Sequence, residues 1–173
     1  MQKAGYLFWT IMCLLAFPAL ARAEQTACDL LTKADVEAIT GMQVTATKLE
    51  SLGLCAGFCI STTGTRCVYT GMLAGSLHDV YLAVEFPPYA VRDIIGFDED
   101  TAKQTQGVHT ARMRVLGLPA LWFISPKFYA FLHIVDGGDV HFLIGQDGIP
   151  DDDVALHQAL SMADRVYGRY KAH

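Results

Sequence analysis

An Asp-Gly-Gly-Asp sequence at residues 136–139 separates two strand-like runs, residues 128–135 and 140–144. Glycine tolerates the positive φ angles of tight turns, so a glycine pair between two such runs is typical of a β-hairpin. Other runs of strand length occur at residues 44–49, 66–72, 80–86, 112–115 and 120–124. Because several of these runs follow one another with no helical segment between them, they favour an antiparallel sheet.

Three segments have the pattern of helices that would cover this sheet. The first, residues 33–40, begins at Thr32, whose hydroxyl can accept a hydrogen bond from the Asp35 N–H. A second is expected at residues 89–95, and the last begins at the three aspartates 151–153. The apolar stripe expected on the last helix consists of Leu156, Leu160, Ala163, Tyr167 and Tyr170. We therefore predict an α+β fold, in which a largely antiparallel sheet packs against helices.

The first 23 residues have the three parts of a secretory signal peptide. Lys3 precedes an apolar run over residues 4–20, and the small-x-small sequence Ala-Arg-Ala follows at 21–23. The apolar run is shorter than the ~20 residues that span a bilayer. We predict cleavage after Ala23, which leaves residues 24–173 as a single periplasmic or secreted domain that does not span the membrane. An uncleaved anchor and a lipoprotein are the disfavoured alternatives.

The charge balance disfavours nucleic acid as a partner. The whole chain has 13 lysines and arginines against 18 aspartates and glutamates. Cleavage would remove Lys3 and Arg22 but no acidic residue, so the mature chain is more acidic still. The remaining basic residues are scattered, and no zinc-finger or RNP-like spacing occurs among them. An acidic chain without a basic patch is repelled by a phosphate backbone.

Four cysteines remain after cleavage: Cys28, Cys55, Cys59 and Cys67. An even number in an exported chain indicates disulfides, because the compartment outside the cytoplasm is oxidising. Four cysteines allow three pairings, which the sequence alone does not distinguish. We favour Cys28–Cys67, which would link an N-terminal helix to a strand, together with Cys55–Cys59, which would close a short loop.

The pair Cys55 and Cys59 also has three chemical interpretations. With a histidine, the two sulfurs could bind copper or zinc. Residues 53–57 match the G-x-C-x-G pattern of a hydrolase nucleophile, although the buried strand that this motif needs is missing before them. A thiol redox centre is disfavoured by the three intervening residues. We therefore predict no catalytic residue, no cofactor and no metal ligand, with a soft-metal protein and a small cysteine hydrolase as alternatives.

The histidines available for a metal are His78, His109, His133 and His141. The length of the turn at residues 136–139 decides whether the last two can act together. With a two-residue Gly-Gly turn, His133 and His141 would lie on opposite faces of the hairpin. Only a three-residue loop would bring them side by side.

Two short sequences give the chain a resemblance to a known group. Residues 28–32 read Cys-Asp-Leu-Leu-Thr and lead into a short helix, and residues 67–69 read Cys-Val-Tyr. With the Val-Leu-Gly-Leu-Pro-Ala-Leu-Trp sequence at 115–122, this pattern resembles small bacterial envelope proteins, including cell-wall lipoproteins with a PsbP-like α/β sandwich. The resemblance covers most of the mature chain, and the missing lipidation site is a departure from it. It implies the sandwich fold and a Cys28–Cys67 bridge, but no catalytic residue.

Aromatic residues crowd the region around the predicted hairpin. Because strand side chains alternate between two faces, some of them must point away from the core. We expect an interaction surface that includes Trp122, Phe128, Tyr129 and Phe131. The sequence therefore favours a non-catalytic exported domain that binds another envelope protein or a small ligand. This class includes inhibitors and immunity-type partners of toxins or enzymes.

Overall fold

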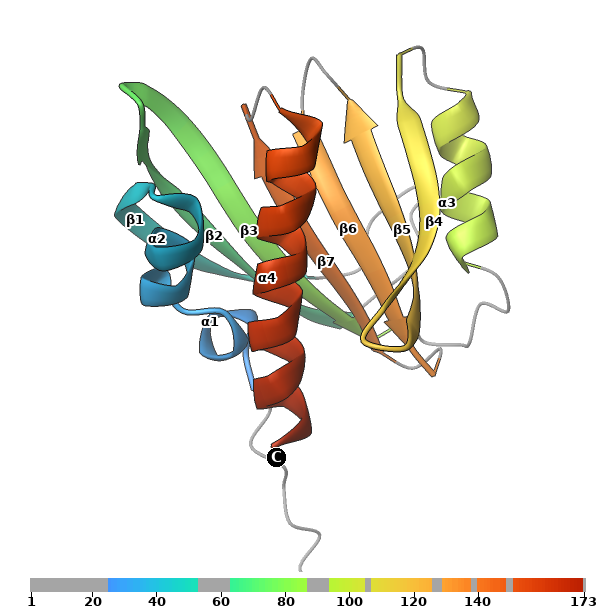
Figure 1. Cartoon of the computed structure of the whole chain (residues 1–173). Helices are drawn as coiled ribbons and strands as arrows, with labels where there is room; N and C mark the ends of the chain where they lie inside the picture. Colours follow the sequence, from blue (N-terminus) through green and yellow to red (C-terminus); the bar gives the residue numbers. More distant parts are fainter. Residues whose placement is uncertain are drawn as a thin grey trace, which may run out of the picture.

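The computed structural model describes residues 25–52, 63–86, 94–104, 107–125, 129–137, 140–148 and 151–172. Its strands are β1 (Gln43–Leu52), β2 (Thr63–Leu73), β3 (Ser76–Phe86), β4 (His109–Val115), β5 (Leu118–Ser125), β6 (Tyr129–Asp136) and β7 (Val140–Asp147). Its helices are α1 (Ala27–Leu30), α2 (Lys33–Thr40), α3 (Ile94–Lys103) and α4 (Asp152–Lys171). Figure 1 shows one twisted sheet with α4 running across it.

The strands form a single antiparallel sheet in the order β1-β2-β3-β7-β6-β5-β4. Two meanders, β1–β2–β3 and β4–β5–β6–β7, join where β3 pairs with β7. The β2–β3 and β4–β5 turns have positive φ angles at both central residues, Ala74-Gly75 and Leu116-Gly117. Turns of this mirror-image kind match the twist of the strands that they connect. In this strand order, β1 and β4 are the two edge strands of the sheet.

The predicted α+β class is wrong, because strands dominate the structure. It is 53% strand and 32% helix, with one C-terminal helix on a seven-stranded sheet, so the architecture is mainly β. The strands are longer than their local patterns indicate. For example, the run expected at residues 44–49 becomes the ten-residue strand β1, which also includes Gln43 and Glu50–Leu52. Polar edge residues carry little apolar periodicity, so pairing with β2 rather than a local pattern determines this strand.

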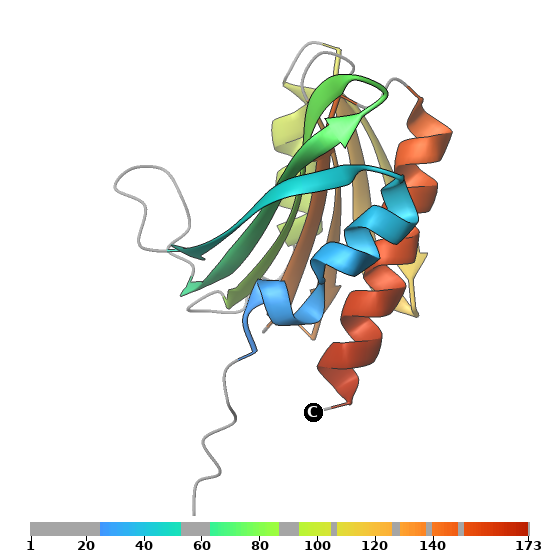
Figure 2. The ribbon, with the colours of Figure 1, turned by 90° about the vertical axis from the view of Figure 1, so that its left-hand side faces the viewer.

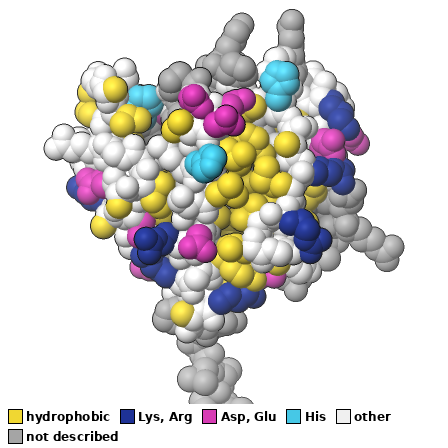
Figure 3. Space-filling model, in the orientation of Figure 1, with side chains coloured by type: hydrophobic (Ala, Val, Ile, Leu, Met, Phe, Trp, Pro, Cys, Tyr) yellow, Lys and Arg dark blue, Asp and Glu magenta, His cyan; other side chains and the backbone are white. Residues whose placement is uncertain are grey.

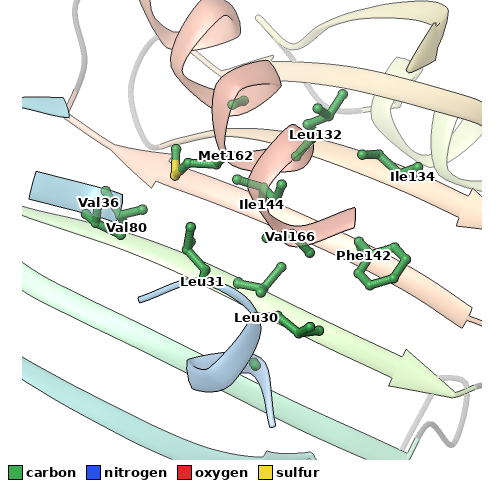
Figure 4. Close-up of a cluster of buried hydrophobic side chains, with 14 of the residues drawn as sticks. Leu30, Leu31, Val36, Val80, Leu132, Ile134, Phe142, Ile144, Met162 and Val166 are labelled. Carbon is green, nitrogen blue, oxygen red and sulfur yellow. The ribbon is translucent and has the colours of Figure 1, made fainter. Parts of the chain in front are cut away.

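The helices α1, α2 and α4 cover one face of the sheet, which we call the helical face (Figure 2). The core lies between them and the strands, and Figure 4 shows how Leu132, Ile144 and Phe142 meet Met162 and Val166 of α4. Removing such apolar side chains from water is the main favourable term in folding. Viewed from this side, further apolar side chains gather at the surface beside α4, with charged side chains around them (Figure 3).

The buried stripe of α4 lies one residue nearer the N-terminus than predicted. The residues buried against the sheet are Ala155, Ala159, Met162, Ala163 and Val166. Leu156 and Leu160, expected at the centre of the stripe, are only partly buried at its margin. Small alanines on the buried side let the helix approach the strands closely, whereas the larger leucines fill the space beside it. Ala163 is confirmed as part of the buried stripe, whereas the larger expected residues lie at its margin.

The helix expected at residues 89–95 is described only in part. Residues 89–93 lie outside the described part of the chain, and residues 94 and 95 begin α3, which continues to Lys103. It contacts β4 and β5. Ile95 packs there against Leu121, with Val135 beside them, on the face opposite α4 (Figure 2). Among the described helices, none has the length and the apolar character that crossing a membrane requires.

A disulfide and a hydrogen bond attach the N-terminal helices to the sheet. Cys28 of α1 and Cys67 of β2 form a disulfide with their Cα atoms 5.1 Å apart, which is the pairing that the sequence analysis favours. The buried Tyr69 hydroxyl donates a hydrogen bond to the carbonyl oxygen of Leu31. Burial raises the pKa of the Tyr69 phenol.

An ion pair attaches the same helices to the end of α4. Arg169 donates from Nη1 to the Leu30 carbonyl at 2.7 Å and to Asp35 Oδ2 at 2.6 Å, and from Nη2 to Asp35 Oδ1 at 3.0 Å. Asp35 also accepts a hydrogen bond from the Thr32 N–H at 2.9 Å, in the predicted cap of α2. The Arg169 guanidinium holds the pKa of Asp35 well below its usual range.

Candidate binding surface

The face of the sheet opposite α4, which we call the outer face, brings together side chains from five strands. Val68, Tyr81, Gly145, Phe131 and Phe123 are direct partners in consecutive strand pairs across β2, β3, β7, β6 and β5. Directly opposite residues of antiparallel strands have Cβ atoms about 5 Å apart, so these five positions form one continuous row.

Three aromatic rings stack at one end of this row, and we call Phe123, Tyr129 and Phe131 the aromatic cluster. The ring centroids of Phe123 and Phe131 are 4.4 Å apart, and Tyr129 lies 5.8 Å from Phe123 and 6.0 Å from Phe131. Phe123 is 8% exposed and Tyr129 is 43% exposed. The cluster therefore has a buried base and an outer ring that reaches the surface. Near-parallel stacking at these distances stabilises the rings beyond simple burial.

Tyr81 extends the aromatic surface across the middle of the sheet. Its ring lies over Gly145, where a Cβ atom would come within 2.0 Å of the ring. Only glycine at position 145 therefore lets the Tyr81 ring lie flat along the row. Burial raises the pKa of the Tyr81 hydroxyl to about 12, so this group is protonated at neutral pH.

Charged side chains border the row on both sides. Towards β1, Glu50 is 2.8 Å from Lys48 Nζ and 2.6 Å from Arg66 Nη2. Towards α3, Glu99 accepts a hydrogen bond from Arg112 Nε at 2.6 Å. Hydrogen bonds from Lys48 and Arg66 lower the pKa of Glu50, and the bond from Arg112 has the same effect on Glu99. An apolar centre with a charged rim is the usual arrangement of a protein-binding surface.

The structure divides the four aromatic residues predicted for an interaction surface. Tyr129 and Phe131 belong to the aromatic cluster, while Phe128 lies outside the described residues. Trp122 points to the helical face, is 6% exposed and packs in the main core. Tyr81 was not among the predicted site residues. Tyr81 could have been recognised by its pairing with Gly145 in the neighbouring strand, but this pairing is known only once the register of the strands is known.

The hairpin between β6 and β7 brings two predicted histidines together. Asp136 pairs with Val140, so the loop has three residues and His141 points to the same face as His133. The ring centroids of His133 and His141 are 5.1 Å apart, and both side chains are buried. Within the described ranges, however, no three or more His, Cys, Asp or Glu side chains form a group that could hold a metal ion.

The other cysteine predictions lie outside the described residues. Cys55 and Cys59 fall between Leu52 and Thr63, where the structure describes no residue. The Cys55–Cys59 disulfide, the soft-metal site and the cysteine nucleophile therefore remain predictions from the sequence.

Comparison with known proteins found no relative of this chain. No family model matches the chain, and no curated protein and no solved structure matches it. The resemblance to PsbP-like envelope proteins accordingly remains a proposal.

Proposed function

We propose that this protein is an exported, non-catalytic binding domain that recognises another envelope protein through its outer face. The observation that carries the proposal is the aromatic cluster, in which Tyr129 reaches the surface above the stacked rings of Phe123 and Phe131. Stacked rings fixed by neighbouring strands lose little side-chain entropy when a partner covers them. Tyrosine is also enriched among the residues that dominate binding energy at interfaces.

The surroundings of the cluster support a protein partner. The row continues through Tyr81, and ion pairs at Glu50 and Glu99 border it. A partner that places an apolar or aromatic side chain against Tyr129 would exclude water from the centre, while its charged groups face the rim. Electrostatic complementarity at such a rim favours the correct partner more than it adds affinity.

Two features support export. Residues 1–23 have the parts of a signal peptide, and the Cys28–Cys67 disulfide is of a kind that persists in oxidising compartments. The proposal therefore places the partner in the periplasm or outside the cell. We propose that no metal or cofactor is needed for binding.

The test compares Tyr129→Ala with a matched surface change. Leu77 is 67% exposed at the start of β3, beside the β2–β3 turn, and β7 separates β3 from the strands that carry the cluster, so Leu77→Ala serves as the control. Each variant is used to capture proteins from an envelope extract, and the captured protein is then purified and titrated. We expect Tyr129→Ala to weaken binding at least about tenfold, as substitution of a central interface tyrosine does, and Leu77→Ala to leave it unchanged. Equal affinities for both variants would reject the outer face as the binding site.

A further inference from the structure

Among the described residues, no strand pairs with the outer edge of β1, the first strand of the sheet. β1 lies at the end of the strand order and pairs with β2 alone among the described strands. The opposite edge strand, β4, has α3 beside it. Figure 2 looks onto the edge of β1, with α2 reaching only one end of the strand. An exposed edge presents a row of N–H and C=O groups to which another strand can pair.

Within the described part of the chain, a hydrogen bond from outside the sheet is made at the start of β1 and at no later backbone N–H of the strand. Glu37 of α2 accepts a hydrogen bond from the Val44 N–H at 3.1 Å, and the register with β2 shifts between Val44 and Ala46. Beyond this point β1 continues regularly to Leu52, and it contains no proline or glycine. Most of its side chains from Thr45 onward are exposed. A regular edge of this length, without a proline or a bulge, is suited to strand addition.

The charged side chains at the middle of β1 would face opposite charges if two copies of the strand paired antiparallel. Lys48 and Glu50 point to the outer face, where Glu50 lies 2.8 Å from Lys48 Nζ and 2.6 Å from Arg66 Nη2 of the same chain, so a second copy would share these ion pairs. Leu49 between them points to the other side, where it is 50% exposed. Suppose that a second copy of β1 pairs antiparallel with the first about a two-fold axis at Leu49. Lys48 then faces Glu50 of the second copy, Glu50 faces Lys48 of the second copy, and the two Leu49 side chains meet.

We propose that this protein forms a symmetric dimer through antiparallel pairing of β1 with β1 of a second copy, in the register that places Lys48 opposite Glu50. The pairing would extend each sheet into the other and cover the exposed Leu49. Symmetry makes the two charge contacts equivalent. A shift of one residue would place Leu49 opposite Lys48 or Glu50 and move the charges out of register, so the charges select one alignment. This interface does not include the aromatic cluster and does not depend on the proposed function, although it uses Lys48 and Glu50 at the rim of the proposed binding surface.

The test uses two charge-reversal variants. We expect each variant alone to dimerise weakly and a mixture of the two to form a heterodimer. Lys48→Glu would place glutamates opposite each other in a homodimer, and Glu50→Lys would do the same with lysines. In a mixture of the two variants, each glutamate would face a lysine of the other chain. By sedimentation velocity of the purified, disulfide-bonded protein, we expect each variant alone to dimerise at least about tenfold more weakly than the wild type. The mixture should regain most of the lost affinity.

A cysteine substitution tests the register independently. Leu49→Cys places two thiols directly opposite each other, at a separation that a disulfide can bridge, whereas Leu77→Cys does not. Under mild oxidation, a covalent dimer should form with Leu49→Cys and not with Leu77→Cys or the wild type. Circular dichroism of every variant at low protein concentration verifies folding. A monomeric wild type at all concentrations, a dimer indifferent to both charge reversals, or a mixture that stays monomeric would each overturn the proposal.

Discussion

The two faces of the sheet are built from the same alternating strands but are held in different ways. On the helical face, one continuous apolar cluster is reinforced by the Cys28–Cys67 disulfide and by the Arg169–Asp35 ion pair. On the outer face, the described cover is α3 at one side, and the aromatic cluster includes a tyrosine that reaches the surface. Stability should therefore depend mainly on the helical face, whereas the proposed binding uses the outer face.

This difference also explains why the same residue type has different roles on the two sides. Tyr69 on the helical face is buried and donates to the Leu31 carbonyl, so its hydroxyl is used within the fold. Tyr129 on the outer face stacks on two rings and keeps much of its surface exposed. A buried, paired tyrosine stabilises the fold, whereas an exposed tyrosine on a rigid base can stabilise a complex.

Removal of the disulfide should have the largest effect on stability. Cys28 and Cys67 are separated by 39 positions in the chain. Closing a loop of about this length contributes on the order of 4 kcal/mol in the chain-entropy model. We expect the double variant Cys28→Ala/Cys67→Ala to lose about 2–5 kcal/mol of unfolding free energy, measured by denaturant titration.

The matched control for this variant is Cys55→Ser/Cys59→Ser. If those two residues form the predicted short-loop disulfide, their replacement should cost at most about 2 kcal/mol, because a short loop restrains the unfolded chain less. A loss below about 1 kcal/mol for the Cys28/Cys67 variant would mean that the noncovalent contacts of Tyr69 and Arg169 hold the N-terminal helices by themselves.

Substitutions along α4 sharpen the position of the core. Met162 is fully buried against the sheet, while Leu160 lies at the margin of the stripe. We expect Met162→Ala to cost about 2–5 kcal/mol and Leu160→Ala about 1 kcal/mol, because the second site already borders solvent. Thermal and denaturant unfolding of the two variants measures the difference. A larger loss of unfolding free energy for Leu160→Ala than for Met162→Ala would mean that Leu160 lies in the core, as the sequence alone indicates.

Local signals made part of the fold predictable. The α2 helix begins and ends as expected: Thr32 accepts a hydrogen bond from the Asp35 N–H, and Gly41 ends the helix with a φ of 72°. The hairpin of β6 and β7 is likewise confirmed. Each of these features depends on residues a few positions apart, so the chain itself carries the information.

The assignment of side chains to faces could not be predicted, because it depends on register. One additional residue in the β6–β7 loop moves His141 from one face to the other, and the glycine-rich turn is compatible with both lengths. In β5, every residue from Ala120 to Ile124 is buried, so no polar alternation separates Trp122 from Phe123. The aromatic cluster therefore became visible only when the strands were paired.

The Arg169–Asp35 pair should have an intermediate and pH-dependent effect. Arg169→Met keeps the aliphatic stem but removes three hydrogen bonds to Asp35 and Leu30. Since the arginine side chain is partly exposed, we expect a loss of about 1–2 kcal/mol at pH 7. The depressed pKa of Asp35 adds stability above its unfolded pKa of about 3.9, and this stability is lost as the pH falls through the folded pKa.

The difference between wild type and Arg169→Met should therefore be constant above about pH 5 and shrink below about pH 4. Urea titrations at a series of pH values measure it. A difference that stays the same down to pH 2.5 would show that Arg169 acts through the Leu30 carbonyl and its packing, rather than through the charge of Asp35.

Tyr129→Ala should have the smallest effect on stability and so give the strictest test of the contrast between the faces. The ring is 43% exposed, and its two stacking contacts are on its inner side. Loss of such contacts should reduce the unfolding free energy by less than about 1 kcal/mol. If the outer face is a binding surface, the same change should weaken partner binding at least about tenfold. Denaturant titration and a binding titration on one protein preparation measure both quantities, and Tyr129→Phe separates the ring from the hydroxyl. A loss of several kcal/mol in stability would instead make Tyr129 part of the core, and the two faces would then not differ in the way that we describe.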